Sequence, residues 1–510
     1  MSKSALPRRG LLVGTAATVI GWNTAGRTWA VSTGQDVTTG QDAPGTAAAV
    51  TQDAVAALPR LDGSLVTDPT ALTRFAGDFG HLVTAAPRAV LRPGSVRDIA
   101  AVVGFARRHR IPVAMNGQSG GGETAELESH SNYGQAAAPG GIAIDARGLN
   151  RVLAVTPGRA VVEAGVTWAQ LTDAALARGW MPPCLTDYLH LSVGGTLSVG
   201  GIGSGVQRHG LQADTVESVD VVTGTGQLLT ASATTNRQLF EAALAGGGQA
   251  GIIVRATLRL VPARERALVF TLFYDDLAAY LGDQERIMAE RRFDLQAGEV
   301  VRDAEGTAWR YKIEAVAHYD GDTPPDRGAL LRGLRCVPGE TTVTDQGARD
   351  YAFRVDGFAA YLKATGLWSQ PKPWLSLFLP ASTARTFVRE ATALLTPADL
   401  GAGILLLYPY TTATLTRPLA VMPDEPVGWH FDLLSFPAPG ADTAAMLRRN
   451  RHLYERAVAL GGKRYLIGAI PGMTPTDWRR HYGAHWAAAT AAKHRYDPAG
   501  ILTPGQGIHA

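Results

Sequence analysis

The segment TDYLHLSVGGTLSVGG, residues 186–201, decides the fold of this chain. It places one carboxylate, Asp187, beside aromatic and apolar residues, and a run of glycines and hydroxyl side chains follows. Glycines let a backbone approach a flat polar ring closely. An aspartate in apolar surroundings has its charged form disfavoured, which favours proton transfer near neutral pH. Asp187 is therefore a candidate acid or base, and an aspartate that caps a turn is the alternative interpretation.

Two further glycine-rich loops adjoin predicted strands. Residues 111–115 alternate as in a strand and lead into the loop NGQSGGG at 116–122. The loop GGGQAG at 246–251 comes directly before an alternating strand at 252–260. Successive backbone N–H groups in such loops can hold a pyrophosphate without a cationic side chain, although a flexible turn is the alternative. No helical pattern opens after the first loop, so the usual dinucleotide-binding fingerprint is missing.

Helices and one more strand are predicted around these loops. A capping-box-like start at Ser95 and Asp98 begins a helix that runs to about His109. A second helix begins at Thr167, with Gln170 as the partner in its capping box, and stops at Gly179. Residues 141–145 form another short strand. The first half of the chain therefore mixes helices and strands.

Composition narrows the class of partner. The 510 residues are 46% hydrophobic and 18% charged, which suits a globular protein of two domains or more. A net charge of +3, without a run of five like charges, predicts no nucleic-acid partner and leaves a small-molecule substrate. Cys184 and Cys336 are too few for a disulfide framework, although one bridge between them stays open. Neither HExxH nor a paired Cys-x-x-Cys occurs, so no metal site is predicted.

The N-terminus is predicted to be an export signal. Arg8 and Arg9 precede a weakly apolar stretch, residues 10–26, and small residues surround a cleavage site near Ala30. This resembles a bacterial twin-arginine (Tat) signal peptide over residues 1–30, read by the Tat export machinery. A disordered basic N-terminus is the alternative. The stretch is too short and polar for a membrane span, and residues 31–59 are interpreted as a linker. The expected location is periplasmic or extracellular.

Several ordered motifs carry a resemblance to a known family. They are residues 186–210, VVTG at 221–224, LF at 239–240, residues 246–255, GLRCVPG at 333–339, GLWSQPKPWL at 366–375, YP at 408–409, PDE at 423–425, YDP at 496–498 and ILTPGQ at 501–506. From about residue 60 to the C-terminus the chain resembles the vanillyl-alcohol-oxidase-type (PCMH-type) flavoproteins, and cytokinin dehydrogenases in particular. The resemblance implies a two-domain α+β fold. Residues 60–263 and the C-terminal return at 461–510 would build the FAD-binding domain, and residues 264–460 a substrate domain of antiparallel sheet flanked by helices.

The resemblance also implies which residues contact FAD and substrate. The pyrophosphate would lie against Asn116, Gly117, Gln118, Ser119, Gly120, Gly121 and Gly122. The rest of the cofactor would lie against Thr186, Asp187, Thr196, Leu197, Ser198, Gly201, Ile252, Ile253, Tyr465 and Gln506. Asp187 matches the active-site acid, and Trp374, Leu375 and Ala297 fall near the substrate.

The family reaction implied is amine dehydrogenation. Asp187 would accept a hydrogen bond or proton from the substrate N–H while the adjacent C–H leaves as hydride to flavin N5, and the imine then hydrolyses. The resemblance does not choose between oxygen and a quinone as electron acceptor.

Two departures from the family pattern qualify this expectation. Gln118 stands where the family has a histidine bonded to the flavin, so FAD is expected to be held non-covalently. Ala297 stands where the family has a glutamate that holds an adenine-type substrate. The alternatives are the same fold oxidising another amine, an alcohol or a sugar, a non-catalytic flavin or ligand carrier, and a nicotinamide-dependent dehydrogenase.

Overall fold

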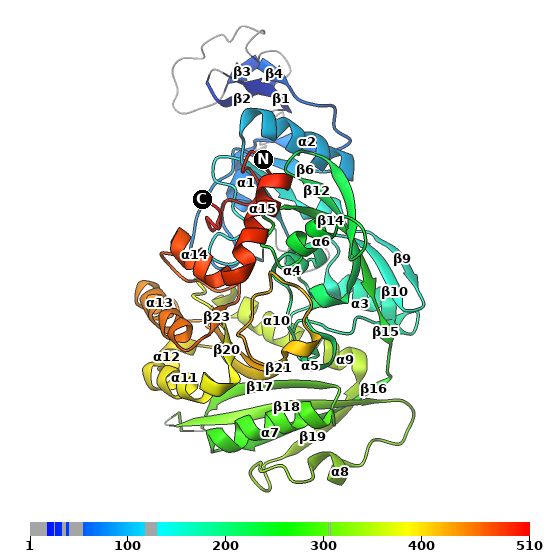
Figure 1. Ribbon diagram of the computed structural model, residues 1–510, viewed down its shortest axis with the longest axis vertical. Coiled ribbons are helices and arrows are strands. Elements are labelled where there is room, and N and C mark those ends of the chain that lie inside the picture. The colour runs from blue at the N-terminus through cyan, green and yellow to red at the C-terminus, as the bar shows by residue number, and fades with distance from the viewer. Residues whose placement is uncertain are drawn as a thin grey trace, which may run out of the picture.

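The computed structural model describes residues 18–24, 26–32, 37–39, 55–117, 130–303, 305–306 and 308–510. In these ranges the chain forms two large domains stacked along the longest axis of the molecule (Figure 1). The first domain holds two larger sheets and a two-stranded ribbon, and the second is built on one large antiparallel sheet. The predicted two-domain α+β fold is confirmed.

The first sheet of the FAD-side domain carries the first glycine loop. Its strands β5 (Ser64–Val66), β6 (Ala89–Arg92), β8 (Ile142–Asp145) and β7 (Val113–Asn116) lie in that order, and β6, β8 and β7 run parallel. Helix α1 (Pro69–Arg74) precedes β6, and α2 (Val96–His109) connects β6 to β7. The predicted helix at 95–109 is confirmed, but its capping box is wrong. Asp98 instead accepts hydrogen bonds from the backbone N–H groups of Asp62, Gly63 and Gly94.

Four short strands precede this domain in residues that the sequence predicts as signal and linker. They are β1 (Thr18–Asn23), β2 (Thr28–Ser32), β3 (Val37–Thr39) and β4 (Val55–Ala57). β1 pairs with β2 and β4, and β2 pairs with β3, so residues 31–32, 37–39 and 55–57 within the predicted linker are paired strands. Arg8 and Arg9 lie outside the described residues, and the export prediction stays a prediction.

The second sheet packs against the segment 186–201, which contains α4 (Val193–Val199). Its order is β13 (Leu228–Ser232), β12 (Val216–Thr223), β14 (Gly251–Arg259), β10 (Arg159–Glu163) and β9 (Val152–Thr156). A ribbon of β11 (Trp180–Met181) and β15 (Val261–Pro262) adjoins it. Helix α3 (Trp168–Leu176) begins with the predicted capping box of Thr167 and Gln170. The remaining helices of this part are α5 (Val206–His209) and α6 (Arg237–Ala243).

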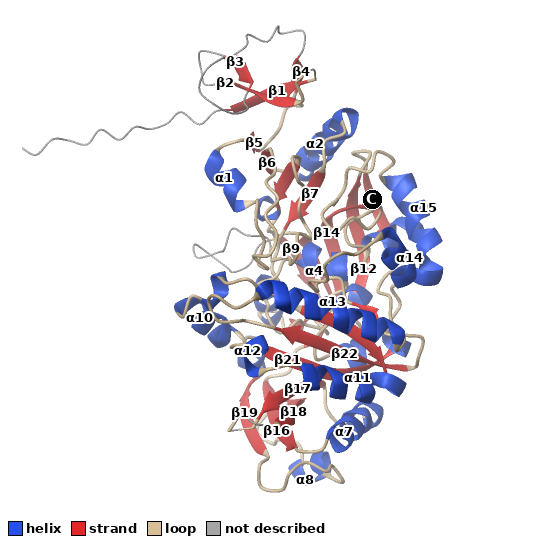
Figure 2. Ribbon diagram, turned by 90° about the vertical axis from the view of Figure 1, so that its left-hand side faces the viewer, coloured by secondary structure: helices blue, strands red, loops and turns tan. Residues whose placement is uncertain are grey.

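The second domain is an eight-stranded antiparallel sheet. Its order is β19 (Thr342–Gly347), β16 (Arg266–Tyr274), β18 (Trp309–Tyr319), β17 (Leu295–Arg302), β21 (Ile404–Thr411), β22 (Val427–Leu434), β20 (Leu375–Pro380) and β23 (Lys463–Arg464). Helices α7 (Leu277–Glu290), α11 (Ala381–Leu394) and α13 (Thr443–Ala459) pack on one face and bury a core against it (Figure 2). The shorter helices are α8 (Arg327–Leu331), α9 (Ala348–Ala352), α10 (Asp356–Ala364) and α12 (Pro397–Leu400).

The other face of this sheet points at the FAD-side domain. One continuous core contains Val193 and Leu197 of the first domain together with Phe378 and Tyr408 of the second. Strands with two buried faces form such a shared core because each face excludes water from apolar side chains. The two domains therefore meet across the sheet face that lies opposite its helices.

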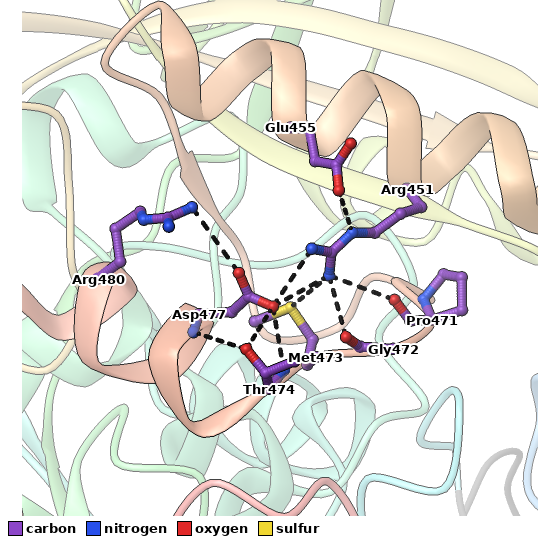
Figure 3. Close-up of polar contacts among 8 residues, drawn as sticks. All are labelled: Arg451, Glu455, Pro471, Gly472, Met473, Thr474, Asp477 and Arg480. Atoms are coloured by element: carbon purple, nitrogen blue, oxygen red, sulfur yellow. Dashed lines mark hydrogen bonds and ion pairs between the residues drawn. The ribbon is translucent and has the colours of Figure 1, made fainter.

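The C-terminal segment returns to the first domain through α14 (Pro475–Tyr482) and α15 (Trp486–Tyr496). Figure 3 shows how the return is anchored to α13. Arg451 donates hydrogen bonds to Asp477 (3.2 Å), to Glu455 (2.7 Å) and to the Gly472 carbonyl (3.2 Å). Asp477 also closes the capping box that begins α14 with Thr474. This network fixes the loop between α13 and α14, which carries Tyr465.

Candidate functional site

A cavity of about 370 Å³ lies between the two domains, within the size range of small-molecule and cofactor sites. On the side of the first domain the lining includes seven glycines. They come from three loops, from α4 and from the start of β14: Gly117, Gly194, Gly195, Gly201, Gly247, Gly248 and Gly251. On the side of the second domain the lining side chains come from the sheet, from α10 and from nearby loops.

Gly201 shows why this wall requires glycine. Its φ of +71° lies in the left-handed region, and an added Cβ would come within 2.1 Å of Gln212 Oε1. Its N–H donates to the Tyr465 hydroxyl at 3.1 Å. Tyr465 therefore joins the C-terminal return to the glycine wall, and burial raises the pKa of its phenol.

Most of the predicted cofactor residues line this cavity. They are Gly117, Thr186, Asp187, Thr196, Ser198, Gly201, Ile252, Ile253 and Tyr465. Three predicted positions do not. Leu197 is buried in the core behind α4, Asn116 is buried at the end of β7, and Gln506 donates to the Leu466 carbonyl. Gln118, Ser119, Gly120, Gly121 and Gly122 lie outside the described residues.

The geometry of this wall fits an FAD. A ring that is recognised by backbone needs glycines at close approach, and seven line the cavity. Thr196 and Ser198 add hydroxyls from α4, while Ile252 and Ile253 begin the strand after the second glycine loop.

Asp187 lies in the cavity wall, but not in the apolar surroundings that the sequence suggested. Arg354 Nη2 donates to Asp187 Oδ1 at 2.6 Å, and Arg354 Nε lies 3.1 Å from Glu314 Oε1. Both carboxylates and the guanidinium line the cavity. Asp187 Oδ2 receives no hydrogen bond from a described residue, and about a quarter of the side chain is exposed (27%). One oxygen is therefore held while the other faces the cavity.

Arg354 is supported by the elements around it. It follows α9, and its guanidinium lies 4.3 Å from the ring centre of Tyr351. The Tyr351 hydroxyl donates to Glu314 at 2.7 Å. Burial disfavours the charged guanidinium, but the neighbouring Tyr351, Asp187 and Glu314 together hold the pKa of Arg354 above its ordinary value. Arg354 and Glu314 were not predicted, because nothing in the sequence links them to Asp187, which is more than a hundred positions away.

An aromatic wall closes one end of the cavity. The rings of Phe79 and Trp374 lie 5.3 Å apart, and those of Trp374 and Phe436 lie 5.8 Å apart. The buried ammonium of Lys372 donates to the Phe79 and Trp368 carbonyls and so ties this wall across both domains. A flat apolar or heteroaromatic group could stack here.

Only two of the three predicted substrate residues line the cavity. Trp374 and Ala297 line the cavity. Leu375 does not, and this prediction is wrong. Leu375 begins β20 and is fully buried in the core beneath α11 and α13, whereas Trp374 lies in the segment that precedes the strand.

Further polar residues of the second sheet line the cavity and were not predicted. Glu299 on β17 is paired with Lys312 at 2.7 Å. His430 and Asp432 lie on β22, two positions apart and therefore on one face. The signal was present in the sequence, since both polar residues interrupt an otherwise apolar strand, WHFDLL.

The described residues also show the state of the two cysteines and bear on the predictions about membrane spans and metal sites. Cys184 is buried and Cys336 is half-buried, and both are free thiols, so they form no bridge. Within the described ranges no helix is long and apolar enough to cross a membrane. In the same part of the chain no cluster of three or more His, Cys, Asp or Glu side chains could hold a metal ion.

The families that this chain matches are described as FAD-binding and its relatives as oxidoreductases or dehydrogenases, in agreement with the glycine-lined cavity. Residues 87–232 match the FAD binding domain family, and residues 301–509 match the family described as "Cytokinin dehydrogenase 1, FAD and cytokinin binding". An uncharacterized oxidoreductase, ORF5 in the fasciation locus of Rhodococcoides fascians, is 38% identical over 446 residues, which cover 87% of this chain and 99% of the relative. Cytokinin dehydrogenase 10 of Oryza sativa subsp. japonica is 34% identical and covers 87% of this chain and 88% of its own length. Cytokinin dehydrogenase 4 of the same plant is 34% identical, with 89% and 92% covered.

Proposed function

The chain belongs to the cytokinin dehydrogenase family of FAD-dependent oxidoreductases, and from this premise we propose that it oxidises a secondary amine of the N-substituted adenine class. One observation carries the proposal. Asp187 lines the same cavity as the glycine backbone, and only one of its two carboxylate oxygens is held by a hydrogen bond from a described residue. FAD, when bound, supplies the acceptor for the hydride of the substrate C–H bond.

Asp187 is the group that handles the proton. Its Oδ2 accepts a hydrogen bond from the substrate N–H, which raises the electron density on nitrogen as the neighbouring C–H bond breaks. The amine loses a hydride from carbon and a proton from nitrogen, and becomes an imine. Water then cleaves the imine to an aldehyde and a primary amine. An acid would be unnecessary in a protein that only carries flavin, and this argues against the carrier alternative.

Arg354 acts through Asp187 as a positioning residue. A bond of 2.6 Å to Oδ1 fixes the direction in which the carboxylate faces. The same guanidinium contacts Glu314, so its charge is shared between two carboxylates. Without it, two negative groups would face each other in a partly dehydrated cavity, which costs free energy.

The aromatic wall suits the other part of such a substrate. Trp374 and Phe436 are held in place by ring contacts and by the hydrogen bond from Trp374 Nε1 to the Ser435 carbonyl at 3.1 Å. A planar heterocycle can stack on these rings while its N-linked side chain reaches Asp187.

A substrate panel tests this proposal. Purified holoenzyme with a dye acceptor should turn over N-alkylated adenines faster than matched alcohols, sugars and aliphatic amines. Faster turnover of an alcohol or a sugar would contradict the amine assignment, and no turnover of any compound would favour the carrier. The panel also fixes the substrate with which the variants below are measured.

Two finer points complete the proposal. We propose non-covalent FAD, because Gln118 cannot form the histidine link of the family. Acid precipitation should leave a colourless pellet, and a yellow pellet would contradict this.

We also propose export through the twin-arginine route. Replacing Arg8 and Arg9 with Lys should retain the protein in the cytoplasm, whereas unchanged export of that variant would contradict the signal.

A further inference from the structure

Two polar residues of β22 lie in the cavity wall without a role in the reaction described above. His430 is 1% exposed, and neither ring nitrogen has a hydrogen-bond partner among the described residues. Asp432 is 4% exposed and accepts one hydrogen bond, from the buried Ser376 hydroxyl to its Oδ1. The remaining oxygen of Asp432 lies 3.7 Å from His430 Nε2, beyond hydrogen-bond distance. A buried imidazole with two unsatisfied nitrogens is costly unless a ligand satisfies them.

We propose that His430 and Asp432 form a recognition subsite for a neutral polar edge of the substrate, with a hydrogen-bond donor and acceptor side by side, as on the nitrogen-rich edge of a purine. The inference rests on the proposed function, and it names the residues that select the ring. Both side chains point into the same cavity as Asp187 and Trp374.

The register of the sheet explains how such a subsite arises in this chain. Asp432 pairs with Leu406 of β21, which pairs with Glu299 of β17, so Asp432 lies two strands from β17. Ala297, at the position where the family resemblance places a glutamate, lies on β17 two residues before Glu299. Strands lie about 4.8 Å apart, so the backbone of Asp432 lies roughly 10 Å across the sheet from that of Glu299.

The surroundings favour uncharged forms of both residues. Burial lowers the pKa of His430 to about 3, so the imidazole is neutral and offers one donor and one acceptor. Burial, with a further contribution from the charge of Asp187, raises the pKa of Asp432 to about 7, although the Ser376 hydroxyl opposes this. A protonated carboxyl likewise offers a donor and an acceptor. A carboxylate or an ammonium group would find no opposite charge in this pair, so the subsite prefers a neutral ligand.

The test compares two inert ligands on the holoenzyme. A purine prenyl ether and phenyl prenyl ether share one side chain and lack the N–H that oxidation needs, but only the purine has the hydrogen-bonding edge. Binding is read from the change in flavin absorbance. The wild type should bind the purine ether about 10- to 100-fold more tightly, as expected where the analogue leaves buried polar groups unpaired. Equal affinity for the two ethers would overturn the inference.

Substitutions of His430 and Asp432 test whether these two residues cause the preference for the purine ether. Asp432→Val and His430→Phe should each weaken the purine ether about tenfold and leave the phenyl ether within about twofold. Phe is suited to position 430 because the rings of Phe378, Tyr408 and Tyr465 already surround it. Asp432→Asn, which keeps a donor and an acceptor, should retain most of the affinity. Loss of affinity in Asp432→Asn equal to that in Asp432→Val would overturn the neutral pairing.

Further readouts separate this subsite from a structural role and from the proposed reaction. Leu433→Met changes the opposite face of β22 at similar volume and should alter neither ligand. The FAD content and the reduction potential of the bound flavin should be unchanged in all variants, and a shifted potential would mean that His430 and Asp432 serve the cofactor instead. If the wild type prefers the purine ether but does not oxidise the corresponding amine, the proposed function fails while the subsite stands.

Discussion

The two walls of the cavity differ in how they are built. The wall of the FAD-side domain includes seven glycines, from loops, from α4 and from the start of β14. The wall of the second domain presents side chains from one sheet, from α10 and from nearby loops, among them Glu299, Glu314, His430 and Asp432. Glycine backbone can bind the same cofactor whatever the substrate is. Side chains on the face of a sheet can be changed one at a time without disturbing the sheet. Asp187 and its partner Arg354 join the two walls.

The largest effect is expected where the two walls meet. Asp187→Asn should slow anaerobic flavin reduction by substrate about 10²- to 10⁴-fold, the usual contribution of a positioned acid or base. The change is nearly isosteric, so FAD content should be retained and dithionite should still reduce the flavin. An unchanged rate would show that hydride transfer needs no proton acceptor here, and loss of FAD would make Asp187 structural.

The next effect concerns the residue of the second domain that holds Asp187. Arg354→Met removes the cation that two carboxylates share, and flavin reduction near pH 7 should fall about tenfold or more, with FAD retained. Arg354→Lys keeps the positive charge without the planar guanidinium and should restore part of the rate. If Arg354→Lys reduces the flavin no faster than Arg354→Met, the charge at this position has no part in the reaction.

These expectations show which parts of the molecule the sequence could predict. The glycine-rich loops could be recognised in the sequence, and Gly117 and Gly201 were predicted and line the cavity. Seven further residues that the family resemblance implied as cofactor contacts line it too. The wall of the second domain was not predictable, because its members are brought together by strand register. Trp374 and Leu375 are neighbours in sequence, yet only Trp374 lines the cavity while Leu375 is buried on the helix-covered face of the sheet. Arg354 reaches Asp187 only after the two domains have packed.

A smaller effect is expected on the glycine wall. Gly201→Ala places a Cβ against the buried Gln212 side chain and strains a φ of +71°, which costs about 1 to 2 kcal/mol. FAD affinity should fall about tenfold, measured by the FAD retained after dilution, while the rate of reduction in the FAD-saturated enzyme stays close to that of the wild type. Gly104→Ala, in α2 with nothing within 4 Å of the added Cβ, is the matched control and should bind FAD normally. Equal losses in both variants would contradict a special role for Gly201.

The smallest effect is a change of stability with pH in the wall of the second domain. The pKa of Asp432 is raised from 3.8 to about 7 in the folded protein, so folding favours its protonated form. The stabilisation of that form is complete below about pH 4 and is lost as the pH rises through about 7, because ionisation is easier in the unfolded chain. In Asp432→Asn the side chain stays neutral and can still accept the hydrogen bond from the Ser376 hydroxyl. The thermal midpoint of the variant should therefore match that of the wild type at about pH 4 and exceed it by a margin that grows with pH to a few degrees at pH 8. A difference that does not change between these two pH values would show that Asp432 is already ionised in the folded protein, and would remove the neutral carboxyl from this wall.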